Sequence, residues 1–258
     1  MRLLMADLPG APGAALPPTG SVLDTDGLAR VYAAGRSSGG WLRTNFATSL
    51  DGAITGPDGR SGSVNSEADH VVFELLRALS HAVVVGAGTV RSEGYPALAV
   101  DERWRETRGG LGLPDALPVV AVSNRGEMPP SFADQPSGSV LLALPSGSPG
   151  LADARARLGP DQVVVCGDDT VDGRRLVAAL GERGWTQLLC EGGPQLHGAL
   201  VAAGVVDELC LSITPVVVGG DGARVTAGAG VDAAYRPLVL VEEDGTLMGR
   251  WVRPSGSR

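Results

Sequence analysis

The sequence predicts a three-layer α/β fold, with a mainly parallel sheet, helices on both faces and an antiparallel hairpin at the C-terminal end. Short apolar runs alternate with helical patterns from Trp41 onward, and this alternation is typical of a parallel sheet covered by helices. Two of the apolar runs end in glycine-rich turns. The last two strand-like runs have no helix between them, which indicates a hairpin.

The pattern begins with a strand at Leu42–Ser49, which the turn Asp51-Gly52 ends. A helix is expected to start at Ser66-Glu67, with Ser66 or Asn65 as its cap. The helix has an apolar stripe, which consists of Val71, Val72, Leu75, Leu76 and Leu79. This stripe predicts that one face of the helix is buried. The buried strand Ala82–Val85 follows directly.

The polar segment Leu98–Leu117 contains Trp104 among charges and is expected to form a loop with some helix rather than core. Strands are then expected at Val119–Val122, Val140–Leu144 and Val163–Cys166. Helical patterns lie at Leu151–Leu158, Val171–Arg183 and Pro194–Ala203. The final strand-like runs are Glu208–Val218, Leu238–Val241 and Leu247–Val252, and the turn Glu243-Asp244-Gly245 joins the last two.

The first forty residues have a different character. Leu8–Gly20 is rich in Pro, Gly and Ala without apolar periodicity, Asp26–Ala34 is a short helical pattern, and Gly35–Gly40 resembles a linker. We therefore expect residues 1–40 to form a surface extension, partly irregular with one short helix. Residues 41–254 are expected to form one domain.

Composition excludes several classes of function. The net charge is −8, and the chain contains no lysine, so all 21 basic residues are arginine. This excludes a lysine Schiff base and a Walker A loop, and it leaves little positive surface for nucleic acid. No apolar run is long enough for a signal peptide or a membrane span, so we expect a cytoplasmic protein. The three cysteines and three histidines have no metal-binding spacing, so no metal site is expected.

Two strand ends indicate a nucleotide site. Gln187–Leu200 has the pattern of a buried strand that opens through Gly192 and Gly193 into a helix, where backbone N–H groups can meet a phosphate. The strand Ala82–Val85 ends similarly in Gly86-Ala87-Gly88-Thr89. Two such ends in one domain predict a dinucleotide, bound where ligands lie in open α/β sheets.

Five motifs together resemble the pyrimidine reductase family of riboflavin biosynthesis, over roughly Trp41 to Arg253. In chain order they are Thr48-Ser49-Leu50-Asp51-Gly52, Leu76-Arg77-Ala78, Gly86-Ala87-Gly88-Thr89-Val90, Glu191-Gly192-Gly193-Pro194 and Val206-Asp207-Glu208-Leu209. The resemblance implies a dihydrofolate-reductase-like fold. It also implies reduction by NADPH of 5-amino-6-(5-phosphoribosylamino)uracil to the ribitylamino product, in a homodimer. The zinc deaminase signature that accompanies the reductase in many bacteria is absent, so the resemblance is to the reductase half.

The resemblance also assigns site residues. Asp51 and Glu191 are expected to be catalytic, with Asp51 a partly buried carboxyl of raised pKa that assists protonation or orients the ring. Substrate contacts are expected from Ser61, Arg77 and Glu191. Arg125 is the candidate for the 2′-phosphate that distinguishes NADPH from NADH, because arginine binds phosphate as a bidentate fork. The expected cofactor-binding residues are Ala47, Gly86, Gly88, Thr89, Glu93, Ser123, Arg125, Gly192, Gly193 and Pro194.

The segment Glu93–Val100 departs from the family pattern. Glu93 stands in place of the first residue of the usual Asp-Asp-Pro, and the arginine that follows a few residues later in the family is missing. That arginine helps to hold the substrate phosphate. An alternative is therefore a reductase of dihydrofolate or another pterin-like ring. A third hypothesis is a catalytically silent nucleotide-binding protein on the same fold.

Overall fold

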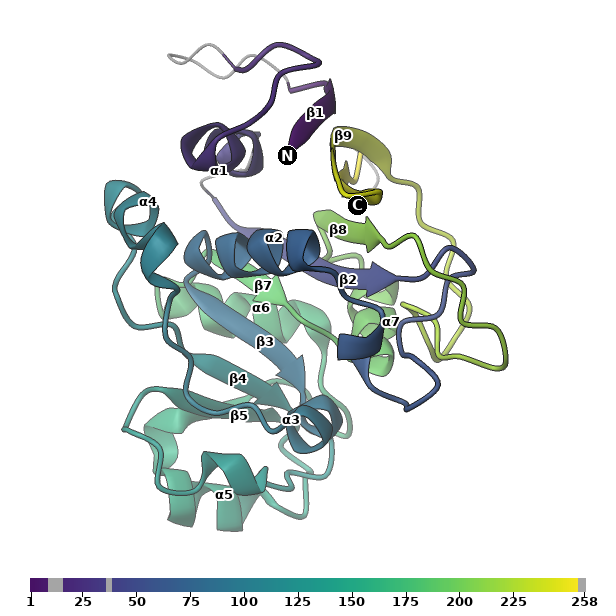
Figure 1. Ribbon diagram of the computed structural model, residues 1–258. Coiled ribbons are helices and arrows are strands. Elements are labelled where there is room, and N and C mark those ends of the chain that lie inside the picture. Colours follow the sequence, from purple (N-terminus) through teal and green to yellow (C-terminus); the bar gives the residue numbers. More distant parts are fainter. Residues whose placement is uncertain (9–15, 36–38, 255–258) are drawn as a thin grey trace.

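The computed structural model describes residues 1–8, 16–35 and 39–254. Its strands form one ten-stranded sheet in the order β1-β9-β10-β8-β2-β7-β3-β4-β5-β6 (Figure 1). From β8 to β6 all neighbouring strands run parallel, whereas β10, β9 and β1 add on in antiparallel fashion. The prediction of a mainly parallel sheet with a C-terminal antiparallel hairpin is confirmed.

The elements have these bounds. The strands are β1 (Arg2–Ala6), β2 (Trp41–Thr48), β3 (Ala82–Gly86), β4 (Val119–Val122), β5 (Val140–Leu144), β6 (Val163–Val165), β7 (Gln187–Cys190), β8 (Glu208–Ile213), β9 (Arg236–Glu243) and β10 (Thr246–Val252). The α-helices are α1 (Thr25–Ala33), α2 (Glu67–Ala78), α3 (Ala87–Glu93), α4 (Arg105–Gly110), α5 (Leu151–Leu158), α6 (Gly173–Glu182) and α7 (Pro194–Ala202). One predicted strand was too long, because β8 ends two residues before Pro215, which has no N–H to donate to a neighbouring strand.

The sheet separates two helical layers. Side chains alternate along a strand, so Val83 and Val85 lie in clusters on one face with residues of α1, α2, α3 and α5, while Val84 packs on the other face with residues of α6 and α7. Figure 1 shows α2 in front of the sheet with α6 and α7 behind it. Helices thus cover both faces, as predicted.

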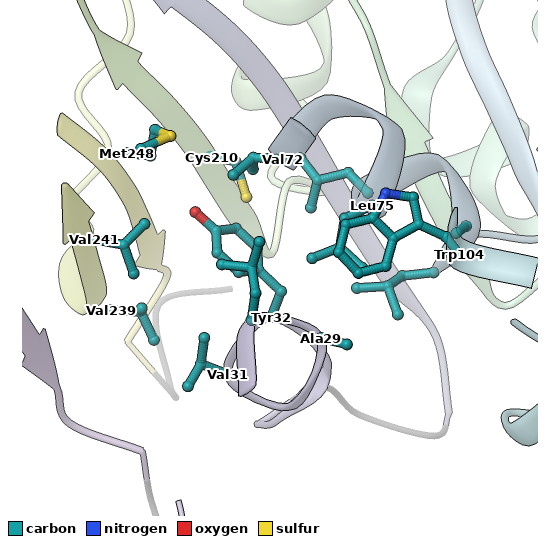
Figure 2. Packing of buried hydrophobic residues seen from close by; sticks show 14 of the residues in the cluster. Ala29, Val31, Tyr32, Val72, Leu75, Trp104, Cys210, Val239, Val241 and Met248 are labelled. Atoms are coloured by element: carbon teal, nitrogen blue, oxygen red, sulfur yellow. The ribbon is translucent and has the colours of Figure 1, made fainter. Parts of the chain in front are cut away.

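The described part of the N-terminal segment is built into the fold, so the expectation of a surface extension is wrong there. β1 pairs with β9 at the edge of the sheet. Val31 and Tyr32 of α1 are fully buried, and Figure 2 shows them among Val239 and Val241 of β9 and Val72 of α2. The irregular Leu8–Gly20 stretch and the Gly35–Gly40 linker fall largely on residues 9–15 and 36–38, outside the described residues.

A buried charge cluster ties α1 to the sheet. Glu208 accepts hydrogen bonds from the guanidinium groups of Arg43 (2.9 and 3.0 Å) and Arg250 (2.7 and 3.0 Å), and all three side chains are at most 2% exposed. Burial alone would raise the pKa of Glu208, but the two arginines hold it far below its usual range. The arginines also donate to backbone carbonyls of Tyr32, Val31 and Ala34 at the end of α1.

The segment Leu98–Leu117 contains α4, as expected, but the prediction that it contributes no core is wrong. Trp104 and Arg108 are each 1% exposed. The guanidinium of Arg108 donates to the carbonyls of Ala78 (3.2 Å), Ser80 (2.6 Å) and Ala116 (2.8 Å). Arg108 therefore joins this segment to the end of α2, where unpaired carbonyls attract a cation.

Candidate active site at the carboxyl ends of β3 and β7

The two predicted glycine turns meet. Gly86, at the end of β3, donates its N–H to the carbonyl of Gly192 (2.7 Å), which follows β7. Gly192 has a φ of +99°, and the peptide bond between Gly192 and Gly193 is cis. A Cβ at Gly193 would lie 2.6 Å from the Thr89 hydroxyl. The turns therefore approach each other so closely that a larger residue at Gly193 would displace its neighbour.

A groove of about 330 Å³ borders this junction. Gly86, Ala87 and Gly88 line it from the start of α3, and Gln195, Leu196 and Ala199 line it from α7. Asn124, from the turn after β4, and Gly173 complete its walls. Two helix starts thus border one groove, an arrangement suited to a pyrophosphate.

A pocket of about 270 Å³ borders the same junction, where Thr89, Gly193 and Pro194 line it. Seven of the predicted site residues line it, namely Ala47, Ser61, Thr89, Glu93, Glu191, Gly193 and Pro194. Asn45, Asp69 and Tyr95 line it as well, although the sequence analysis missed them. Among the described lining residues are three carboxylates and no arginine. The pocket therefore suits a ligand rich in hydrogen-bond donors.

Glu191 is held in place by Arg77. Arg77 donates two hydrogen bonds to the two Glu191 oxygens, at 2.7 and 2.9 Å, and a third to Glu74 at 3.1 Å. Burial alone would lower the pKa of Arg77, but the carboxylates of Glu191 and Glu74 raise it above its usual range. The arginine also stacks over Phe73, 4.0 Å from the ring centroid. Arg77 was expected to contact the substrate, and the structure pairs it with Glu191 instead.

Tyr95 belongs to the segment that departs from the family pattern, and it lies beside this ion pair. Its phenol hydrogen-bonds to Glu191, and burial together with that carboxylate raises its pKa well above the ordinary value. The Arg77 guanidinium lies 5.9 Å from the Tyr95 ring centroid. Glu191 thus has a cation and a phenol as neighbours at the pocket wall.

Asp51 differs from the expectation of a partly buried carboxyl with a raised pKa. Its side chain is exposed, and it accepts hydrogen bonds from the Ser49 hydroxyl (2.5 Å) and from the N–H groups of Val218 (3.2 Å) and Gly219 (2.6 Å). These bonds lower the pKa of Asp51 from 3.8 to about 2. Through these hydrogen bonds, Asp51 connects the segment after β8 to the end of β2.

Ser123 and Arg125, which were expected to bind the cofactor near its 2′-phosphate, are not among the described residues that line the groove. The Ser123 hydroxyl accepts from the N–H of Gly126 (3.1 Å) and so stabilises its own turn. Arg125 is exposed and pairs loosely with Glu127, at 4.0 Å. In the turn after β4, Asn124 lines the groove. Ser61, in contrast, donates to Glu93 (3.3 Å), so two predicted residues meet at the pocket.

The described residues contain no group of three or more potential metal-ligating side chains of His, Cys, Asp or Glu. In the same part of the chain, no helix combines the length and apolar character that a bilayer span requires.

Residues 40–246 match the family model of the RibD C-terminal domain. A relative from Methanothermobacter thermautotrophicus, named 2,5-diamino-6-ribosylamino-4(3H)-pyrimidinone 5′-phosphate reductase, is 32% identical over 192 residues, which cover 73% of this chain and 84% of the relative. The riboflavin biosynthesis protein RibD of Mycobacterium tuberculosis is 29% identical over 175 residues, which are 68% of this chain and 42% of that protein. This chain thus corresponds to less than half of that longer relative.

Solved structures agree on the fold. A pyrimidine reductase-like protein from Corynebacterium diphtheriae superimposes with a TM-score of 0.72 at 24% identity, covering 83% of this chain and 92% of that one. RibD of Acinetobacter baumannii gives 0.65 at 21% identity, covering 84% and 59%. These structures have the fold that the sequence motifs predicted. Because this family model matches residues 40–246, which is most of the chain, the chain belongs to the family of the RibD C-terminal domain.

Proposed function

We propose that this chain reduces the ribosylamino group of a phosphorylated aminopyrimidine to the ribitylamino product, with NADPH as reductant. The proposed substrate is 5-amino-6-(5-phosphoribosylamino)uracil. The observation that carries the proposal is the junction of the two glycine turns, which is bordered by both a groove and a carboxylate-lined pocket. The names of the archaeal and bacterial relatives support the same reaction class.

The groove fits a dinucleotide. Gly86 and Gly88 line it, and a Cβ at Gly88 would meet no atom within 4 Å. We assign the pyrophosphate to the helix starts at Gly86–Thr89 and Gly193-Pro194, which leaves the nicotinamide at the pocket, near Ala47 and Thr89. When bound, the nicotinamide supplies the hydride.

The pocket residues then hold the pyrimidine. Glu191, fixed by Arg77, is assigned to substrate orientation, and the hydrogen-bonded pair Ser61 and Glu93 is assigned to further substrate contacts. Because no described lining residue is an arginine, we assign the substrate phosphate to the rim. There the exposed Arg60 follows the lining residue Gly59, and the exposed Arg224 follows Ala223.

Preference for NADPH over NADH is assigned to Arg125, which is exposed and whose ion pair with Glu127 is long. Substitution Arg125→Ala is expected to raise KM for NADPH at least fivefold and to leave KM for NADH unchanged. Equal effects on both cofactors would remove Arg125 from the phosphate site.

The proposal includes a homodimer in the cytoplasm. Leu50, Val216 and Val217 are exposed apolar side chains near one another, since the Leu50 N–H donates to the Val216 carbonyl (2.8 Å). Such a patch is a candidate subunit contact. Light scattering of the wild type and Val217→Asp tests it, and a monomer in both would contradict the dimer.

The function is tested by following NADPH oxidation at 340 nm with three compounds offered separately. These are the proposed uracil phosphate, the diaminopyrimidinone phosphate named for the archaeal relative, and dihydrofolate. Turnover of a pyrimidine phosphate, with loss of that turnover in Glu191→Gln, supports the proposal. Turnover of dihydrofolate alone would establish the pterin alternative, and NADPH binding without any turnover would establish the silent one.

A further inference from the structure

The pocket contains a buried carboxyl group whose hydrogen bonds are incomplete. Asp69, in the first turn of α2, is only 2% exposed and lines the pocket. The Ser212 hydroxyl hydrogen-bonds to its carboxyl. The Oδ1 atom of Asp69 is buried and has no partner among the described residues. Since a buried polar atom without a hydrogen bond is costly, this oxygen needs an explanation.

A second side chain of the same pocket shares this feature. Asn45 of β2 is 7% exposed, and its Oδ1 likewise has no partner in the described part of the chain. Asn45 pairs in register with Cys210, and Ala47 pairs with Ser212, so these neighbours on β2 and β8 border the place where Asp69 enters. Two unpaired acceptors therefore line one cavity.

Asp69 occupies a position in α2 where core packing alone does not explain a carboxyl side chain. Asp69 precedes the buried Val72 by three residues and the buried Leu76 by seven, so it lies on the apolar face of the helix. An apolar residue there would avoid the cost of burying a carboxyl. The adjoining pocket wall adds Glu93 and Glu191 without an arginine among the described lining residues. That lining favours N–H donors and disfavours phosphate.

We propose that Asp69, together with Asn45, accepts hydrogen bonds from N–H groups of the substrate ring, so that the pocket selects a heterocycle rich in such donors. An aminouracil has lactam N–H and amino groups that meet this requirement. The inference rests on the proposed function and makes Asp69 a residue that determines ring specificity.

The state of the carboxyl agrees with this role. Burial raises the pKa of Asp69, and the hydrogen bond from Ser212 offsets part of the rise. A ligand N–H at the unpaired Oδ1 would complete the hydrogen bonds of the carboxylate and favour its ionised form. Binding of the ring thus supplies the partner that the folded chain lacks.

The test uses 5,6-diaminouracil, which has the ring but neither ribose nor phosphate, as a probe in calorimetric titration of the full chain. Asp69→Asn keeps the shape of the side chain but replaces an acceptor by a donor. Glu67→Gln is the matched control, because it removes an exposed carboxylate from the same helical turn. We expect Kd of the probe to rise at least tenfold in Asp69→Asn and to change less than twofold in Glu67→Gln, with melting temperatures close to that of the wild type.

Kinetics supply the second readout. Asp69→Asn is expected to raise KM for the pyrimidine phosphate by a similar factor, with KM for NADPH unchanged. Equal probe affinity in wild type and Asp69→Asn, no probe binding by the wild type at millimolar concentration, or a loss confined to kcat would each overturn the inference. A wild type without pyrimidine turnover that still loses probe affinity in Asp69→Asn would refute the proposed function and leave the ring recognition standing.

Discussion

At the scale of single residues, the pocket depends on charges that are held by specific partners. The side chain of Glu191 is 2% exposed and that of Arg77 is 12% exposed, and they form a bidentate pair. Geometry of this kind fixes both groups more strictly than a single contact does. Glu191 can therefore present a fixed carboxylate to the pocket.

Removal of one member of this pair leaves the other buried without a partner. Arg77→Met is expected to lower the free energy of unfolding by about 3 kcal/mol, the lower end for a broken buried pair. The double variant Arg77→Met/Glu191→Gln should recover a large part of this loss, because no uncompensated charge remains. Urea unfolding of the four proteins of the cycle measures both effects. A loss below 1 kcal/mol in Arg77→Met would mean that the pair is solvated.

The hydrogen bonds of Asp51 favour a positional role over a proton relay, and the sequence had left both roles open. Its hydrogen bonds from Ser49, Val218 and Gly219 keep it ionised at neutral pH, with a pKa of about 2. Asp51→Asn is expected to lower kcat/KM chiefly by raising KM for the pyrimidine. The reason is that Ala223, in the segment after β8 that Asp51 holds through Val218 and Gly219, lines the pocket. NADPH affinity should change little. A fall in kcat at constant KM would restore an acid–base role.

The same carboxyl predicts a pH dependence of stability. Because the pKa of Asp51 falls from 3.8 to about 2 on folding, its contribution is fully present above about pH 5 and is lost as the pH falls through about 2. The difference in urea midpoint between wild type and Asp51→Asn should therefore be constant from pH 7 to about pH 5 and shrink below that. A difference that did not change between pH 4 and pH 2 would contradict this assignment.

At the scale of elements, the candidate site is formed by strand ends and the helices that follow them. α3 begins directly after β3, and α7 begins after Gly192 and Gly193. Parallel strands bring these starts to one edge of the sheet. The groove between the two helices is thus a product of strand order, since β7 lies next to β3 although a hundred residues separate them.

A substitution at Gly88 can distinguish an effect on cofactor binding from an effect on folding. A Cβ at Gly88 would meet no atom within 4 Å, so Gly88→Ala should keep or slightly raise the melting temperature, because alanine favours helix. In the groove, however, the added methyl group would occupy space that we assign to the pyrophosphate, and Kd for NADPH should rise at least tenfold. Gly181→Ala is the control, since Gly181 lies in α6, equally unobstructed and absent from the described groove lining. Equal NADPH affinity in both variants would place the cofactor elsewhere.

At the scale of the whole molecule, the N-terminal segment completes the core. α1 supplies carbonyl acceptors to Arg43 and Arg250 and covers the β9 and β10 side of the sheet. Buried arginines that lose acceptors carry a large desolvation cost. A domain that starts at residue 41 would lack these contacts.

Deletion of residues 1–40 is therefore expected to abolish cooperative thermal unfolding and near-ultraviolet circular dichroism. Deletion of residues 1–20 removes β1 but leaves α1, and this shorter truncation should keep a cooperative transition at a lower temperature. The comparison isolates the role of α1. A cooperative, fully structured chain of residues 41–258 would support a separable extension and contradict the prediction.

Local patterns in the sequence determined most of the elements. The apolar runs Val119–Val122 and Val140–Leu144 and the helical pattern Leu151–Leu158 coincide with β4, β5 and α5. Ser66 caps α2 as predicted, accepting from the N–H of Asp69. Such features depend on residues close in sequence, so periodicity and capping residues suffice to find them.

Local sequence also sufficed to predict which two glycine turns border the candidate site, because paired glycines at such strand ends have a local signature, and in the structure these turns meet. Only the tertiary structure decided which charges would be paired, exposed or left without partners. Arg77 and Glu191 are 114 residues apart, and Arg43 and Glu208 are 165 apart. For the unpaired oxygen of Asp69 the sequence offers one indication, namely a carboxyl residue on the apolar face of a helix. Its environment depends on side chains from β2 and β8, and burial and long-range pairing, which set pKa and hydrogen bonding, exist only once those strands have come together.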